Sequence, residues 1–202
     1  MMKLIPFLSL IFCCVSCSAQ TIQFPFSDKG WEHQVDGLLP EKWHSFDRVK
    51  LYETKFENIE RFYGESNRFK VSDKNYSPDL QCYLIGDDYV AVFQSGPLGG
   101  WSTITGILIA KKAAYNNKNC AKSIELPAEI ADIQIGDTKE KVYDMLGQPS
   151  FNEADLLAYR YEQEVGSKIP NSGKVIYVTS GIEIGLVKEK VSWIRVYWQE
   201  ST

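Results

Sequence analysis

Two stretches of the chain, residues 49–66 and 133–150, show the same succession of residue types, and this repeat constrains the fold more than any other feature. Each opens with two alternating apolar residues, followed by a cap residue that has glutamate three positions later, which is typical of a helix start. Apolar residues at helical spacing follow, and a glycine ends each helix ten residues past the cap. A duplicated unit is predicted, because one short amphipathic helix cannot bury its apolar stripe alone. The matched positions are Val49 and Leu51 with Ile133 and Ile135, Thr54 and Glu57 with Asp137 and Glu140, Ile59, Phe62 and Tyr63 with Val142, Met145 and Leu146, and Gly64 with Gly147.

A stretch rich in β-forming residues follows each predicted helix. In the first half, apolar residues alternate up to a turn at Gly86–Asp88, and two further strands follow. In the second half, the expected strands are separated by a turn at Ser180–Gly181. Each half is therefore predicted to be a short helix followed by about three antiparallel strands. The strand signals are Leu80, Cys82 and Leu84, Tyr89 to Phe93, Trp101 to Ala110, Leu157, Tyr159 and Tyr161, Val175 to Val178, Ile182, Ile184 and Leu186, and Val191 to Trp198.

The predicted fold class is α+β, with two similar units that each place a short helical layer on an antiparallel β-sheet. We expect a signal segment at 1–19 and a lead-in segment at 20–47 that packs on the first half. The first helix-plus-sheet unit is expected at 48–122 and the second at 123–202, with a polar linker at 115–122.

The N-terminus has the features of a leader that directs export. Lys3 is the only charge before an apolar run at 4–12, which is too short to span a bilayer permanently. Small residues follow, so cleavage before Gln20 predicts a periplasmic or secreted protein. Alternatively, Val15-Ser16-Cys17 is similar to a lipobox, which would make Cys17 a lipidated N-terminus and the protein an outer-membrane lipoprotein.

Only Cys82 and Cys120 remain if the leader is removed by cleavage before Gln20. An even pair of cysteines in an oxidising compartment predicts one disulfide between them. The formal net charge of the whole chain is −4, which argues against nucleic acid or an anionic lipid surface as the main partner.

The second repeat contains Gly136-Asp137-Thr138-Lys139-Glu140-Lys141-Val142 and then Leu146-Gly147-Gln148-Pro149. This motif resembles one found in the SmpA/OmlA (BamE-like) outer-membrane lipoproteins and in β-lactamase inhibitory proteins. The resemblance implies a small helical layer against an antiparallel sheet, and a tandem copy implies a concave sheet that grips another protein. The first copy has Tyr52-Glu53 where the motif has glycine, and no binding residue of either family can be transferred.

Motifs for catalysis or metal binding are weak in this sequence, and we expect no enzyme activity and no cofactor. The glycine-rich stretch 96–100 joins two strands and lacks the lysine of a phosphate-binding loop, so a hairpin turn is expected there. His33 and His44 are eleven residues apart, which matches no compact metal motif. Asp87-Asp88 is expected to be a solvated hairpin tip.

Aromatic residues are the best candidates for binding, because aromatic and arginine side chains supply most of the energy in protein interfaces. On the last strand, Trp193, Arg195 and Tyr197 share one side, and that side either faces outward or is covered by another part of the chain. Trp101, beside a glycine-rich tip, is a second candidate. The favoured function is an exported, non-enzymatic protein that binds another protein, such as an inhibitor or immunity protein. The alternative is a structural lipoprotein of envelope assembly.

Overall fold

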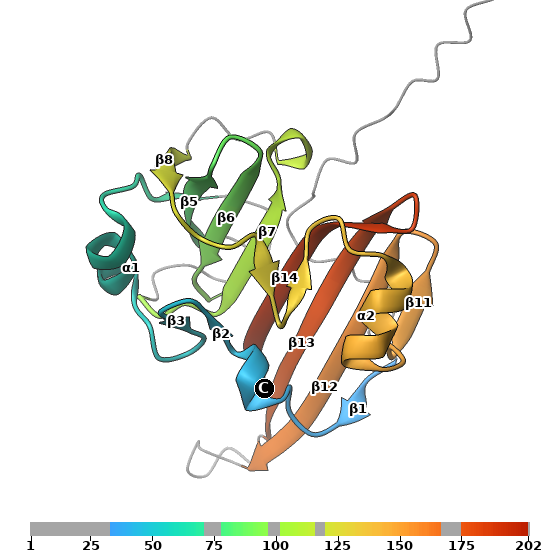
Figure 1. Ribbon diagram of the computed structural model, residues 1–202. Coiled ribbons are helices and arrows are strands. Elements are labelled where there is room, and N and C mark those ends of the chain that lie inside the picture. Colours follow the sequence, from blue (N-terminus) through green and yellow to red (C-terminus); the bar gives the residue numbers. More distant parts are fainter. Residues whose placement is uncertain (1–32, 71–77, 97–101, 116–119, 167–174, 202) are drawn as a thin grey trace, which may run out of the picture.

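The computed structural model describes residues 33–70, 78–96, 102–115, 120–166 and 175–201, and that part of the chain has an α+β fold (Figure 1). Cys17 and Trp101, two of the predicted site residues, lie outside the described residues. In chain order the elements are β1 (Val35–Asp36), η1 (Glu41–Trp43), β2 (Ser45–Phe46), β3 (Val49–Lys50), α1 (Phe56–Tyr63), β4 (Phe69–Lys70), β5 (Asp79–Ile85), β6 (Tyr89–Gln94), β7 (Gly106–Lys111), η2 (Lys112–Ala114), β8 (Ala121–Ile124), β9 (Glu129–Ile130), β10 (Ile133–Gln134), α2 (Lys139–Leu146), β11 (Phe151–Glu153), β12 (Leu156–Gly166), β13 (Ile176–Val187) and β14 (Lys190–Ser201).

One large sheet of ten strands dominates the described residues, with the order β1-β12-β13-β14-β7-β6-β5-β4. Strands β4–β7 form one antiparallel meander and β11–β14 form another, and the last strands of the two, β7 and β14, pair with each other. The short strands β4 and β8 pair with β5, while β1 and β11 pair with β12. Short strands at both edges leave few free backbone groups there, which reduces edge-to-edge aggregation.

Both helices begin one residue later than the sequence predicted. The cap of α2 is Thr138, whose hydroxyl accepts a hydrogen bond from the Lys141 amide at 3.3 Å. Asp137, the predicted cap, instead accepts from the Gln134 amide and pairs with the Lys141 ammonium. Thr54 likewise accepts from the Lys50 amide, before α1 begins. In both cases the acceptor closes the tight turn before the helix and does not cap it.

The predicted helix ends are confirmed, because α1 and α2 stop at glycines with positive φ. Gly64 has φ 91° and Gly147 has φ 80°, in the region that favours glycine. The predicted apolar stripes are largely correct, since Ile59 and Val142 are fully buried. Leu146, which was also predicted to lie on the stripe, packs on the core, and Met145 is the exception, with 42% of its surface exposed.

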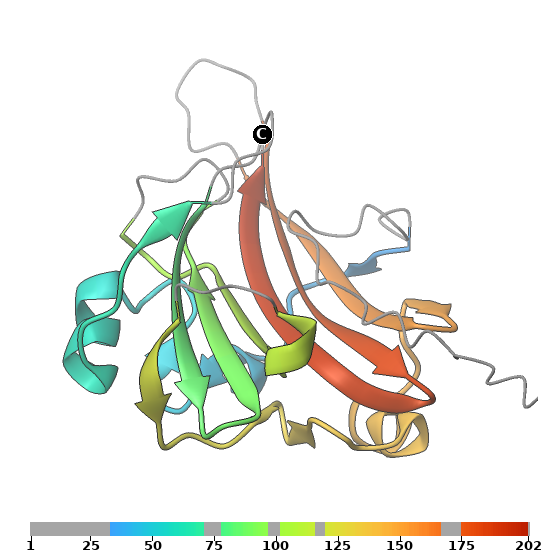
Figure 2. The same cartoon turned by 90° about the horizontal axis from the view of Figure 1, so that it is seen from above.

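The main core lies on the face of the sheet that carries the helices, which we call the helix face. Phe56 of α1 and Val142 of α2 join sheet residues such as Phe93 and Ile184 in one continuous cluster. Seen from above, α1 lies beside the end of the sheet that holds β4–β6, while α2 lies beside the β11–β12 end (Figure 2). The core therefore runs across both halves of the sheet.

The turn predicted at Ser180–Gly181 is wrong, because β13 runs unbroken through both residues. The turn between the last two strands lies instead at Lys188 and Glu189, both with positive φ. Gly181 has a packing role: a Cβ there would lie 2.6 Å from the Tyr159 carbonyl oxygen and 2.8 Å from the Tyr197 hydroxyl. Close approach by neighbouring strands, and not a turn, explains this glycine.

The sequence predicted that the lead-in segment packs on the first half alone. In the structure it packs on both halves. Strand β1 pairs in parallel with β12, and the Leu39 amide donates to the Ser180 hydroxyl at 2.9 Å. Phe46 instead lies 6.2 Å from Phe93 of the first half, measured between ring centroids. This segment therefore helps to close the core over the joint between the two meanders.

The predicted disulfide between Cys82 and Cys120 is present, with the two Cα atoms 4.4 Å apart. It attaches the residue before β8 to the middle of β5, and β8 then pairs in parallel with β5. Cys82 belongs to a smaller apolar cluster on the opposite face of the sheet, together with Leu80, Val92 and Leu108. The expected linker is therefore attached to the first meander at its end.

Candidate functional site

The last strand places Trp193, Arg195 and Tyr197 side by side on the face opposite the helices. Trp193 packs against the smaller apolar cluster, whereas the alternate residues Ile194 and Val196 belong to the main core. Arg195 is only 5% exposed and Tyr197 only 1%, while Trp193 is partly exposed. Of these three candidates, only Trp193 offers appreciable surface to a partner.

A buried network of charges explains why Arg195 points inward. Arg160 Nη2 donates to Glu183 Oε1 at 2.8 Å, and Arg195 Nη2 lies 2.7 Å from Glu183 Oε2. Arg160, Glu183 and Arg195 come from the adjacent strands β12, β13 and β14, so the Glu183 carboxylate lies between the two guanidinium groups. All three side chains are almost fully buried. Buried charges require such pairing, because each loses its hydration when it leaves water.

Two glycines of β13 make room for the aromatic residues beside this network. A Cβ at Gly185 would overlap the indole of Trp193, and a Cβ at Gly181 would contact Tyr197. The Arg195 guanidinium also lies 5.2 Å from the centre of the Tyr197 ring. Burial raises the pKa of the Tyr197 hydroxyl, and the Glu183 carboxylate acts in the same direction. This part of the opposite face is thus tightly packed.

The two histidines lie apart, and each contacts a different aromatic ring. His33 stacks on Phe151 at 6.1 Å, while His44 meets the edge of Trp198 at 5.0 Å, both measured between ring centroids. Burial lowers the pKa of His44, which favours the neutral imidazole. No group of three or more histidine, cysteine, aspartate or glutamate side chains in the described part of the chain is arranged to hold a metal ion.

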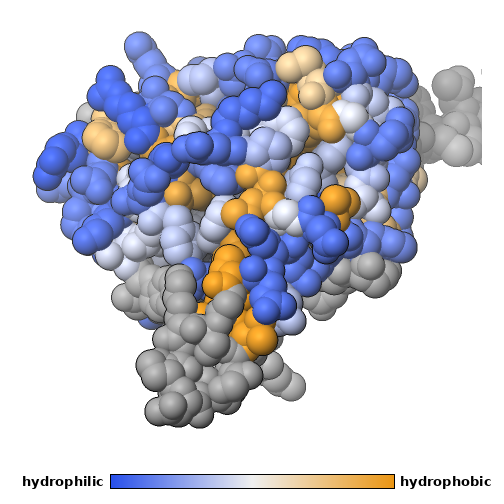
Figure 3. Space-filling view, turned by 90° about the horizontal axis from the view of Figure 1, so that it is seen from below, coloured by the Kyte–Doolittle hydropathy of each residue, from blue (hydrophilic) through white to orange (hydrophobic). Residues whose placement is uncertain are grey.

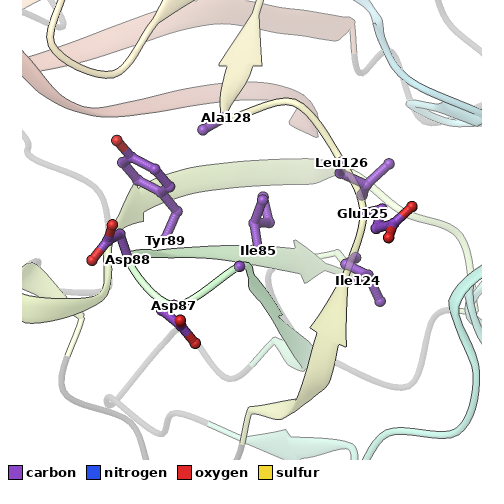
Figure 4. Close-up of a pocket in the computed structure, with 9 residues that line it drawn as sticks. Ile85, Asp87, Asp88, Tyr89, Ile124, Glu125, Leu126 and Ala128 are labelled. Carbon is purple, nitrogen blue, oxygen red and sulfur yellow. The ribbon is translucent and has the colours of Figure 1, made fainter.

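A groove lies beside the turn between β5 and β6, with a volume of about 500 Å³. The turn itself, at Gly86–Asp88, is where the sequence predicted it. The other wall is the segment Ile124–Ala128, which we call the strap, and which leaves β8 and crosses the sheet toward β9 (Figures 1 and 4). The groove is lined by Ile85, Gly86, Asp87, Asp88, Tyr89, Ile124, Glu125, Leu126 and Ala128.

The floor of the groove is apolar and its rim is acidic. Ile85 and Tyr89 face Leu126 across the hollow, whereas the carboxylates of Asp87, Asp88 and Glu125 point outward around it (Figure 4). The apolar residues of the strap pack against the main core, so the floor is the outer margin of that core. No ion pair joins any of the three carboxylates to another described residue.

A second hollow of about 540 Å³ lies on the other side of the same turn. It shares Asp87, Asp88 and Tyr89 with the groove, but its other wall is formed by Lys111, Lys112 and Ala113. The Lys112 amide donates to the Asp88 carbonyl at 2.7 Å, which fixes the short helix η2 against the turn. The tip of the β5–β6 hairpin is therefore acidic on one side and mixed in charge on the other.

Apolar surface is also exposed elsewhere. Figure 3 shows a narrow apolar band between hydrophilic areas on the side seen from below. Among the described residues, Val35 is 52% exposed and Val165 37%, and both lie on strands at the β1–β12 edge of the sheet. None of the helices in the described residues is both long and apolar enough to cross a membrane.

The groove was missed by sequence reasoning because it depends on a contact between distant segments. The pairing of Ile85 with Ile124 brings the strap over the hairpin tip, and two residues 39 positions apart give no periodic signal. The apolar alternation of Ile124 and Leu126 after Cys120 was the one available sign of a further strand.

Comparison of the chain with family models, curated proteins and solved structures found no match. The resemblance to the SmpA/OmlA and β-lactamase inhibitory proteins therefore stays a prediction.

Proposed function

We propose that this chain is an exported, non-enzymatic protein that binds another protein through the groove at the β5–β6 hairpin tip. The observation that carries the proposal is the apolar floor inside an acidic rim, because binding surfaces commonly combine a desolvated apolar centre with a polar margin. Tyr89 and Leu126 are only partly buried, so a partner side chain that enters the groove would cover apolar surface that now contacts water.

The disulfide supports the proposal of export. Disulfides form and persist in oxidising compartments, and Cys82 and Cys120 are the only cysteines outside the leader segment. Together with the apolar run at 4–12, the pair is in accord with a protein that folds outside the cytoplasm.

We further propose that the two halves are copies of one unit, as the sequence repeat predicts. In each half the helix ends at a glycine whose carbonyl accepts a hydrogen bond from a tyrosine of the meander. A serine just after each helix donates to the carbonyl of the residue before that tyrosine. Each helix cap also forms an isolated bridge to the segment at the last strand of its own half. The matched pairs are Tyr83–Gly64 with Tyr159–Gly147, Ser66–Cys82 with Ser150–Ala158, and Lys55–Thr103 with Thr138–Lys190.

A capture experiment tests the binding function. Three proteins would be immobilised: the mature chain, which lacks the leader segment 1–19, and its Leu126→Ser and Met145→Ser variants. Each would be exposed to envelope extract of the source cells, and the bound proteins would be identified by mass spectrometry. Met145 is a matched control, because it is an exposed apolar residue on α2 and does not line the groove. We expect a specific partner on the mature chain and on Met145→Ser that is lost from Leu126→Ser. Equal recovery on all three would contradict the proposed site.

A further inference from the structure

We propose that the groove takes an extended peptide segment in which lysine or arginine residues flank an apolar side chain. This inference rests on the proposed function, and it adds the chemical class of the partner segment. Three features of the groove carry it: the charge of the rim, the apolar floor, and the main-chain groups of Glu125 and Leu126 in the strap.

The charge of the rim specifies cationic residues. Asp87, Asp88 and Glu125 surround the hollow from two segments, and no ion pair with a described residue neutralises them. Lys111 and Lys112 line the neighbouring hollow, but neither lies within ion-pairing distance of these carboxylates. A partner that places positive charge at this rim gains attraction from three carboxylates at once and also reduces their mutual repulsion.

The floor specifies an apolar residue between the charges. Ile85, Tyr89 and Leu126 form a hollow with an apolar centre, and the carboxylates lie outside it (Figure 4). A side chain the size of leucine can enter while neighbouring basic residues remain at the rim. A highly charged segment without an apolar anchor would leave this floor in contact with water.

The strap specifies an extended conformation. Its first residue, Ile124, pairs with Ile85, and the Ala128 carbonyl accepts a hydrogen bond from the Ile135 amide. Between these points, no main-chain hydrogen bond joins Glu125 or Leu126 to another described residue. Unpaired main-chain groups beside a groove allow a peptide to add as a short strand, with its side chains alternating between floor and solvent.

A second copy of this chain is a poor occupant, because the whole chain carries a formal net charge of −4 and the groove itself is acidic. Electrostatic repulsion thus opposes self-association through this surface. An extended segment of a different protein, with basic residues on both sides of an apolar one, fits all three features.

The probe would be a labelled nonapeptide of alternating lysine and leucine, compared with glutamate–leucine and lysine–serine versions. Binding to the mature chain would be measured by fluorescence anisotropy at low and high salt. We expect the lysine–leucine peptide to bind best and to weaken with salt. The triple variant Asp87→Asn, Asp88→Asn, Glu125→Gln should bind it about tenfold more weakly at low salt, since each exposed ion pair contributes modestly.

A matched triple variant controls for the net charge of the protein. Asp132→Asn, Asp144→Asn, Glu164→Gln removes the same number of exposed carboxylates from other surfaces, and its affinity should equal that of the unmodified chain. Equal weakening in both triple variants would overturn the proposal, because the attraction would then be non-specific. Stronger binding of the glutamate–leucine peptide would overturn it as well.

Two other occupants would be detected in the same work. Dimerisation that Leu126→Ser abolishes, measured by analytical ultracentrifugation, would assign the groove to a second copy and overturn the inference. A calcium-dependent rise in melting temperature that only the groove triple variant loses would assign the carboxylates to a cation instead. If the natural partner depends on Leu126 but no peptide shows the expected charge preference, the binding function stands and this inference fails.

Discussion

Replacement of Glu183 by glutamine tests whether the buried charges on the opposite face hold the second meander together. The substitution keeps the shape of the side chain and removes its charge, so Arg160 and Arg195 lose the carboxylate that lies between them. Both guanidinium groups contact it at 2.8 Å or less, and all three side chains are 6% exposed or less. The two arginines would then repel each other at a site with little solvent to screen them.

The expected loss follows from these distances. A guanidinium and a carboxylate whose charge centres lie about 4 Å apart attract by about 4 kcal/mol at an effective dielectric constant near 20. The carboxylate no longer has to be desolvated in the variant, which offsets part of the loss of two such attractions. The net effect of removing one member of a buried ion pair is a loss of about 3–5 kcal/mol in the free energy of unfolding. Urea midpoints should fall by about 2 M if the m-value is about 2 kcal/mol per M.

Urea denaturation with the disulfide intact, followed by tryptophan fluorescence, measures this change. The matched control is Glu57→Gln, which breaks an exposed pair with Arg68 and should cost less than about 1 kcal/mol. Exchange of all three buried residues, as Arg160→Met, Glu183→Leu and Arg195→Met, should restore most of the stability that Glu183→Gln loses. A loss for Glu183→Gln no larger than that of the control would refute the reasoning.

Three further predictions concern other parts of the fold. The double variant Cys82→Ala, Cys120→Ala should lose about 4 kcal/mol, because the bridge closes a loop with a sequence separation of 38; an unchanged urea midpoint would contradict this. Gly181→Ala should lose about 1–3 kcal/mol or more in the same assay, since the new Cβ meets a carbonyl oxygen that cannot move aside. Burial raises the pKa of Tyr83 to about 12 from its usual 10, so the folded state holds this proton more tightly than the unfolded state. The free energy of unfolding should therefore fall as the pH rises from 10 toward 12, and it should fall less in the Tyr83→Phe variant. If the unmodified chain and the variant have identical pH profiles of unfolding free energy, Tyr83 does not contribute.

The sequence predicted those features that depend on neighbouring residues. Gly64 and Gly147 end their helices because a positive φ is required there, and periodicity correctly predicted burial of Ile59 and Val142. The cap positions were wrong by one residue. The predicted caps, Thr54 and Asp137, are good caps by composition, but both close the turn before their helix, and the observed caps are the next residues, Lys55 and Thr138. The backbone conformation decides between the two positions.

Features that depend on distant contacts were predicted less well. Gly181 was interpreted as a turn residue because glycine after serine is common in turns, yet its role is to accommodate Tyr197 from the neighbouring strand. Arg195 was a candidate binding residue on a side that was predicted either to face outward or to be covered, and the structure shows it 5% exposed and paired with Glu183. In both cases the deciding residue lies on another strand, and a single sequence gives no register between strands.

The groove illustrates how one long-range bond can position a surface. Cys120 immediately precedes β8, and its bridge to Cys82 fixes the start of that strand on β5. The strap begins where β8 ends, so its place over the hairpin tip depends on the parallel pairing that the disulfide supports. Because β8 has only four residues, the pairing alone is a weak attachment. Without the bridge, Glu125 and Leu126 should separate from the hairpin tip under conditions in which the ten-stranded sheet is still folded. Binding at the groove should therefore be lost at a lower urea concentration than the fold.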